Sequence, residues 1–189
     1  MPKPTSRQYL IMIQLINLGK TYKNGHLALS SINLKIDEGE MVFITGSSGA
    51  GKTTLLKLLI MIERATQGSI IINGNNINHI SRKEIAKIRR RIGLIFQTPQ
   101  LISSRTIYEN TALPLLIDGY KPREIKRRTR AALDKVNLLS KEKYLPIELS
   151  SGEQQRVGVA RAIVTKPDII LADEPTGNLD PELANNMMN

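Results

Sequence analysis

The residue types and spacing best suited to chemistry in this chain are those from Gly46 to Thr53, GSSGAGKT, which could hold the phosphate groups of a nucleotide. They match the phosphate-loop pattern G-x-x-x-x-G-K-[ST] at every required position. Glycines let the backbone turn so that its N–H groups point at an anion, and a helix N-terminus adds further donors and about half a positive charge. We expect Lys52 to reach the β- and γ-phosphates and the Thr53 hydroxyl to ligate Mg²⁺.

The segments on either side of this loop suit a nucleotide site. Residues 41–45 are apolar and rich in β-formers, which predicts a buried parallel strand. Residues 54–60 are apolar and contain neither glycine nor proline, which predicts a buried helix. The two flanks together favour a nucleoside triphosphate over a glycine turn that binds nothing. The candidate nucleotide-binding residues of this segment are Gly46, Ser47, Ser48, Gly49, Ala50, Gly51, Lys52, Thr53 and Thr54.

The composition bounds the class of protein. With 189 residues, 41% of them hydrophobic and 23% charged, the chain is long enough for one sizeable globular core. It has no cysteine, which excludes disulfides and thiolate metal sites and permits a reducing compartment. The net charge of +10 suggests an anionic partner, which could be a nucleotide, a nucleic acid or an acidic membrane surface.

Membrane insertion is not expected. No run approaches the roughly 20 apolar residues that a membrane helix needs, and the N-terminus does not resemble a secretory signal. We therefore expect a cytoplasmic protein that reaches a membrane only through a partner.

Apolar runs and turn residues predict the order of the remaining elements. Residues 98–149 lose the strand pattern, and Pro122 suits the first turn of a helix there, so this segment is expected to be a helical lobe inserted into an α/β core. The apolar stripe of that helix is expected to be Ile125, Thr129, Ala132, Leu133 and Val136. The cations on its other face are interpreted as a solvated face in preference to a docking surface; they are Arg123, Lys126, Arg127 and Arg130. Residues 1–11 are expected to be an extension. Strands are predicted at residues 13–18, 28–36, 68–74, 92–96 and 168–174.

Two capping boxes mark the starts of helices. Ser81 with Glu84 is expected to open a helix that reaches residue 91, and Ser150 with Glu153 one that reaches residue 166. The predicted strand at 168–174 ends in two carboxylates, Asp173 and Glu174. Neighbouring side chains of a strand point to opposite sides, so these carboxylates can take separate roles, although a strand-end pair can also be a solvated turn.

In this order the phosphate loop, Gln97, the Ser150 helix start and the Asp173–Glu174 pair resemble the nucleotide-binding domain of ABC ATPases. The stretch LSSGEQQRVGVARA looks like the ABC signature, and IILADEPTGNLD looks like Walker B followed by the D-loop. The resemblance covers about residues 12–180. It implies an α/β P-loop NTPase fold with a small N-terminal β lobe, an α/β core in residues 12–97 and 150–189, and a helical subdomain in residues 98–149.

The resemblance also implies roles for single residues. Asp173 would hold Mg²⁺ through water, and Glu174 would polarise the water that attacks ATP, with Lys52 beside the phosphates. Gln97 would contact the metal and couple the site to a transporter partner. Tyr22 matches the aromatic residue that stacks on adenine in this family, although an aromatic side chain at a strand edge is a nearly equal alternative.

Two chains are expected to act together. In this family two domains pair head to tail, so Ser150 and Gly152 would face the γ-phosphate held by the other chain, with Asp180 at the same interface. The stretches RTIYEN and MVFITGSSGAGKTTLLKLL are most similar to the cell-division branch of the family, which works with an integral membrane partner. The branches for lipoprotein release and macrolide export remain alternatives, as does an ATP-binding module that does not hydrolyse ATP.

A nucleic-acid partner is not expected. DNA-repair members of the family carry a long coiled coil between the phosphate loop and the signature, and no such insert fits between Lys52 and Ser150. Translation-type members carry two cassettes, whereas one is present here.

The sequence departs from the family pattern in two places. Ser151 stands where the signature usually has glycine, and its side chain could crowd the opposing γ-phosphate. The switch histidine that follows Walker B in the family has no counterpart, because His26 and His79 both precede Glu174. We therefore expect a truncated or degraded domain that keeps nucleotide binding, hydrolyses ATP weakly, and leaves the strand at 169–172 short of a neighbour.

Overall fold

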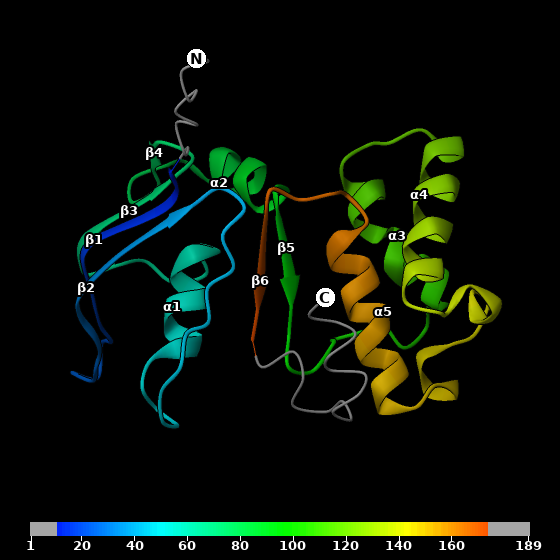
Figure 1. The fold of residues 1–189 in the computed structure, drawn as a ribbon, viewed down its shortest axis with the longest axis horizontal. Helices are drawn as coiled ribbons and strands as arrows, with labels where there is room; N and C mark the ends of the chain where they lie inside the picture. Colours follow the sequence, from blue (N-terminus) through cyan, green and yellow to red (C-terminus); the bar gives the residue numbers. More distant parts are fainter. Residues whose placement is uncertain (1–10, 174–189) are drawn as a thin grey trace, which may run out of the picture. The chain divides into compact units, whose positions relative to one another are not determined.

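The computed structural model describes residues 11–173, which fall into two compact units that divide between Ile85 and Ala86 (Figure 1). The first unit contains β1 (Ile11–Thr21), β2 (Leu27–Asp37), α1 (Lys52–Leu59), β3 (Gln67–Ile72) and β4 (Asn75–Asn76). Helix α2 (Arg82–Arg89) crosses the boundary. The second unit contains β5 (Ile92–Ile95), α3 (Ile107–Ile117), α4 (Pro122–Lys135), α5 (Ser151–Ile163), β6 (Ile169–Ala172) and the short 3₁₀ turns Leu139–Lys141 and Pro146–Glu148.

The first unit is built on an antiparallel sheet in the order β2-β1-β3-β4. Side chains alternate along β1, where Ile13 and Leu15 are buried while Ile16 is 39% exposed. Strands β3 and β4 are joined at Asn73 and Gly74, both with positive φ, which is the backbone that a tight hairpin turn requires. Three of the four strands predicted in this unit, at residues 13–18, 28–36 and 68–74, are confirmed, and β1 begins at Ile11, inside the expected extension.

The second unit combines a parallel pair of strands with a helical cluster (Figure 1). Strands β5 and β6 pair in parallel, from Ile92 opposite Ile169 to Ile95 opposite Ala172. No strand lies between them in the described chain, as predicted for residues 98–149. The core of this cluster consists of Ile107, Ala112, Leu115, Ile125, Ala132, Leu133, Leu138, Leu149, Val157, Ala160 and Val164.

Helix α4 follows its predicted pattern. Pro122 occupies the first turn, and Ile125, Thr129, Ala132 and Leu133 are buried. Val136 is the C-cap and only partly buried. The opposite face is exposed at Arg123, Lys126, Arg127 and Arg130, as expected of a solvated face.

The prediction of a buried strand at residues 41–45 is wrong. These residues have no strand conformation, and Met41 and Phe43 are 64% and 66% exposed. The run is apolar, but a strand forms only when another strand supplies its hydrogen bonds. Within residues 11–173, no strand pairs with this segment. The helices predicted to reach residues 91 and 166 are also shorter, ending at Arg89 and Ile163.

Strand β6 pairs with β5 alone among residues 11–173, and the side chain of Ile170 is 53% exposed. Among the helices of residues 11–173, none has the length and apolar character that crossing a bilayer requires. Glu174 and Asp180, together with residues 1–10, lie outside the described residues.

Candidate nucleotide site

The phosphate loop leads directly into α1, as the sequence predicts. A turn closes where the Ala50 N–H donates to the Ser47 oxygen at 3.2 Å, and Gly49 has φ of +80°. Gly51 is the N-cap of α1, with φ of +92° and ψ of 5°. Regular helical hydrogen bonding then starts with the Leu55 N–H donating to the Gly51 oxygen at 2.9 Å. The loop therefore precedes a helix start, where unpaired N–H groups favour an anion.

Gly51 is required at its position for two reasons. Its positive φ is one that side-chain-bearing residues adopt at a cost. In addition, a Cβ atom there would lie 2.5 Å from the Ala28 oxygen and 2.7 Å from Leu29 Cδ2. The glycine thus sets the loop directly against β2.

Lys52, the first residue of α1, folds back over the loop. Its Nζ donates to the backbone oxygens of Gly46 at 2.7 Å and Ser47 at 3.0 Å. The ammonium group is therefore held among the backbone groups of the loop itself. Thr53, the residue expected to ligate Mg²⁺, follows in the first turn and is exposed.

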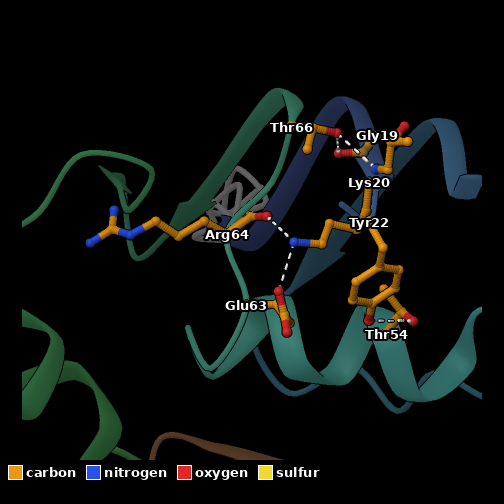
Figure 2. Close-up of polar contacts among 8 residues, drawn as sticks. Gly19, Lys20, Tyr22, Thr54, Glu63, Arg64 and Thr66 are labelled. Atoms are coloured by element: carbon orange, nitrogen blue, oxygen red, sulfur yellow. Dashed lines mark hydrogen bonds and ion pairs between the residues drawn. The ribbon is translucent and has the colours of Figure 1, made fainter. Parts of the chain in front are cut away.

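Tyr22 is connected to the same helix (Figure 2). Its hydroxyl lies 3.2 Å from Thr54 Oγ1, and its ring is near-parallel to that of His26, at 16° with 6.4 Å between centroids. The structure thus brings Tyr22, the residue expected to stack on adenine, next to Thr54 in the first turn of α1. Sequence reasoning did not anticipate this bond, because the two residues lie on different elements.

In the second unit the parallel pairing of β5 and β6 places two site residues at one edge. Asp173 directly follows β6, and Gln97 lies two positions beyond the end of β5. The Asp173 N–H donates to the Ile95 oxygen at 2.9 Å, which continues the ladder to the last described residue. The carboxyl ends of parallel strands are where ligands bind in open α/β sheets. The structure does not describe Glu174.

Ser150 is the N-cap of α5, as predicted. The Glu153 N–H donates to Ser150 Oγ at 3.3 Å, and the Ser150 N–H donates to Glu153 Oε2 at 3.0 Å. Lys141 Nζ lies 2.5 Å from Glu153 Oε1. These hydrogen bonds, from Lys141 first and then from the Ser150 backbone, lower the pKa of Glu153 to about 2. Ser151 and Gly152 occupy the first turn of α5, and Ser151 is exposed.

Two further residues of α5 hold the loop that contains Gln97. Gln155 is 1% exposed, and its Nε2 donates to the Phe96 oxygen at 3.0 Å. Arg161 donates to the backbone oxygens of Pro99 and Gln100, and its partial burial lowers its pKa. Sequence reasoning missed these contacts, although polar residues within an otherwise buried helix face were a signal that could have pointed to them.

The residues present fit a nucleoside triphosphate with Mg²⁺. Residues 46–53 supply a glycine loop, a lysine and a helix start, and Tyr22 supplies an aromatic face. Within residues 11–173 no three His, Asp or Glu side chains gather to form a metal site of their own.

The comparisons with known proteins agree with this assignment. The family model described as ABC transporter matches residues 29–177. The cell division ATP-binding protein FtsE of Escherichia coli strain K12 is 50% identical over 177 residues, covering 94% of this chain and 80% of that protein. FtsE of Bacillus subtilis strain 168 is 46% identical over 171 residues, covering 90% and 75%.

A solved structure has the same fold. The ATP-binding cassette MJ0796, a dimer in a post-hydrolysis state bound to ADP and Pi, is 39% identical with a TM-score of 0.87, covering 94% of this chain and 80% of that one. The chain belongs to the ABC transporter family, with the P-loop NTPase fold of its ATP-binding cassettes, and it is an ATP-binding subunit of a family of ATPases.

Proposed function

We propose that this chain hydrolyses ATP at an interface between two copies and thereby drives an integral membrane partner. The observation that carries the proposal is the glycine loop at the start of α1, with Lys52 Nζ held 2.7 Å from the Gly46 oxygen. A cation held there, beside N–H donors at a helix start, is suited to a polyphosphate.

We assign separate roles to the site residues. Lys52 and the backbone of residues 46–53 bind the phosphates, and Tyr22 stacks on adenine. Thr53, Asp173 and Gln97 hold Mg²⁺, which when bound would offset phosphate charge. Glu174 orients and polarises the attacking water, which makes it the general base of the reaction.

The pairing of two copies is supported by the dimeric cassette MJ0796 bound to ADP and Pi. Each α5 start, with Ser150 and Gly152, would face the γ-phosphate held by the other copy, and Asp180 would lie at the same interface. The capped start of α5 at Ser150 supports this role, because a helix N-terminus favours an anion. In this proposal residues 12–189 form one ABC ATPase domain, with residues 98–149 as its helical subdomain.

Cell division is the process we propose, with an FtsX-like integral membrane protein as partner and with the chain on the cytoplasmic face of the membrane. Support comes from the relatives in Escherichia coli and Bacillus subtilis, both named cell division ATP-binding proteins. Subunits of lipoprotein-release or macrolide exporters are the second candidates, since the cassette itself would serve them equally. Co-purification with an FtsX-like protein, compared with an exporter membrane subunit, distinguishes these candidates.

Nucleotide binding is tested with Lys52→Met, measuring the affinity for ATP with Mg²⁺. Loss of a charged hydrogen-bonding group should weaken binding by about 10- to 100-fold. Lys57→Met is the matched control, because Lys57 lies on the same helix with its side chain exposed. Equal affinities of the two variants would contradict the proposal. Hydrolysis is measured separately, and Glu174→Gln should abolish it while leaving ATP binding intact.

A further inference from the structure

The first unit contains a buried cation that the proposed function does not use. Lys20, near the end of β1, is 7% exposed. Its Nζ donates to Glu63 Oε2 at 2.7 Å and to the Arg64 backbone oxygen at 2.9 Å (Figure 2). Burial of a lysine is costly unless its charge is paired and its donors are used, and here Glu63 and the Arg64 oxygen supply those partners.

The same ammonium group lies close to an aromatic ring. Lys20 Nζ is 4.9 Å from the centroid of the Tyr22 ring, which is within the range of a cation–π interaction (Figure 2). Tyr22 directly follows the last residue of β1, two positions beyond Lys20. The ring is therefore held by Lys20 in addition to the contact between its hydroxyl and Thr54 Oγ1 at 3.2 Å.

These contacts connect Tyr22 to both ends of α1. Thr54 belongs to the first turn of the helix, whereas Glu63 and Arg64 follow its last turn, where the Glu63 N–H still donates to the Lys57 oxygen. Thr66 strengthens the second connection, since its Oγ1 accepts from the Thr21 N–H at 3.0 Å. The ring is thus fixed relative to the helix that begins with the phosphate loop.

We infer that Lys20 is a positioning residue for the base of the nucleotide: paired with Glu63, it holds the Tyr22 ring at a fixed place relative to the start of α1, ready to stack on a planar base. The inference rests on the proposed function, since it takes Tyr22 as the adenine platform. It assigns Lys20 to the base and not to the phosphates, because its polar contacts are with Glu63 and Arg64 and not with residues 46–53.

The test compares two ligands in the full chain, ATP and inorganic tripolyphosphate, which has the phosphates without the base. Lys20→Met should weaken ATP binding by about fivefold and leave the affinity for tripolyphosphate unchanged. Lys20→Arg should restore ATP binding, because a guanidinium can pair with Glu63 and lie over the ring. Lys23→Met, at an exposed lysine of the adjacent turn, should change neither affinity.

A second variant controls for misfolding, because Lys20→Met removes the cation that pairs with the Glu63 carboxylate. The double variant K20M/E63L replaces the ion pair with apolar side chains, an exchange that folded proteins often tolerate, and it should show the same selective loss of ATP affinity. A parallel fall in both affinities, or unchanged ATP affinity in both variants, would overturn the inference. If the unsubstituted chain binds ATP and no selective loss occurs, the inference alone fails. If that chain binds no ATP, the proposed function fails and the inference with it.

Discussion

Gln155 of α5 donates its Nε2–H to the backbone oxygen of Phe96 at 3.0 Å, although the two residues are 59 positions apart. Phe96 directly precedes Gln97, the residue proposed to contact the metal and to transmit the state of the site to the membrane partner. Since Gln155 is 1% exposed, the bond is shielded from water. The helix that carries the signature therefore holds the loop that carries Gln97.

The Gln155→Leu substitution removes this bond and should misplace Gln97. We expect ATP hydrolysis to fall by about 10- to 100-fold, the effect of a misplacement near 1 Å, while ATP affinity changes little. Steady-state hydrolysis and equilibrium binding measure the two effects. Gln154→Leu is the matched control, because Gln154 bonds instead to the oxygens of Pro146 and Leu149. Similar hydrolysis by the two variants would contradict the prediction.

Gly51→Ala should disrupt the phosphate loop. The added Cβ meets the Ala28 oxygen at 2.5 Å on a backbone with φ of +92°. We expect a loss of more than about 2 kcal/mol in unfolding free energy and a large loss of ATP affinity, measured by urea denaturation and nucleotide titration. Gly25→Ala has a similar φ of +82° with nothing within 4 Å, so strain alone should cost it about 1 kcal/mol. Equal losses in both variants would show that the contact with β2 is unimportant.

Glu153 gives the stability of the second unit a pH dependence. Its pKa is lowered from 4.5 to about 2, chiefly by the hydrogen bond from Lys141. A carboxyl whose pKa is lower in the folded state stabilises the fold above its unfolded pKa, and that contribution is lost as the pH falls through the folded pKa. The stability difference between the wild type and Glu153→Gln should therefore shrink as the pH falls from about 4.5 to about 2.

Urea denaturation across this pH range measures the difference. Lys141→Met removes the first cause of the lowered pKa, so in that background the difference should be smaller at neutral pH and should vanish at a higher pH. A stability difference that does not vary with pH would show that the charge of Glu153 contributes nothing to folding.

Asn110 should be important for the stability of the helical cluster. It is fully buried, accepts from the Ile102 N–H at 2.8 Å, and donates to the oxygens of Ile102, Arg105 and Thr106. Asn110→Leu removes the four side-chain hydrogen bonds, and the Ile102 N–H and the Arg105 oxygen lose the partner that Asn110 supplies, so the substitution should cost about 3 kcal/mol in unfolding free energy. Asn76→Leu, at an exposed residue whose side chain accepts one hydrogen bond from Asn78, should cost less than about 1 kcal/mol.

Features set by nearby residues were predictable from the sequence. The capping boxes at Ser81 and Ser150, the turn at Asn73 and Gly74, and the glycine loop ahead of α1 all depend on spacings of a few residues. The buried stripe of α4 follows from helical periodicity in the same way. Each of these signals lies within one element or one turn, so the local structure that it predicts is set by residues close to it in the sequence.

Features that depend on distant residues were not predictable with the same success. Residues 41–45 have the composition of a strand, but pairing with another strand decides whether one forms. The contacts of Lys20 with Glu63 and of Gln155 with Phe96 join residues 43 and 59 positions apart, and no local spacing indicates them. The role of Glu174 stays a prediction, since that residue lies outside the described part of the chain.

The continuity of α5 has a mechanical consequence. Its 13 residues form a stiff rod of about 20 Å, capped by Ser150 at the start and attached along its body to the carbonyls of Phe96, Pro99 and Gln100. Because a helix of this length bends little, we expect a displacement at Ser150 to be accompanied by a displacement of the loop that contains Gln97.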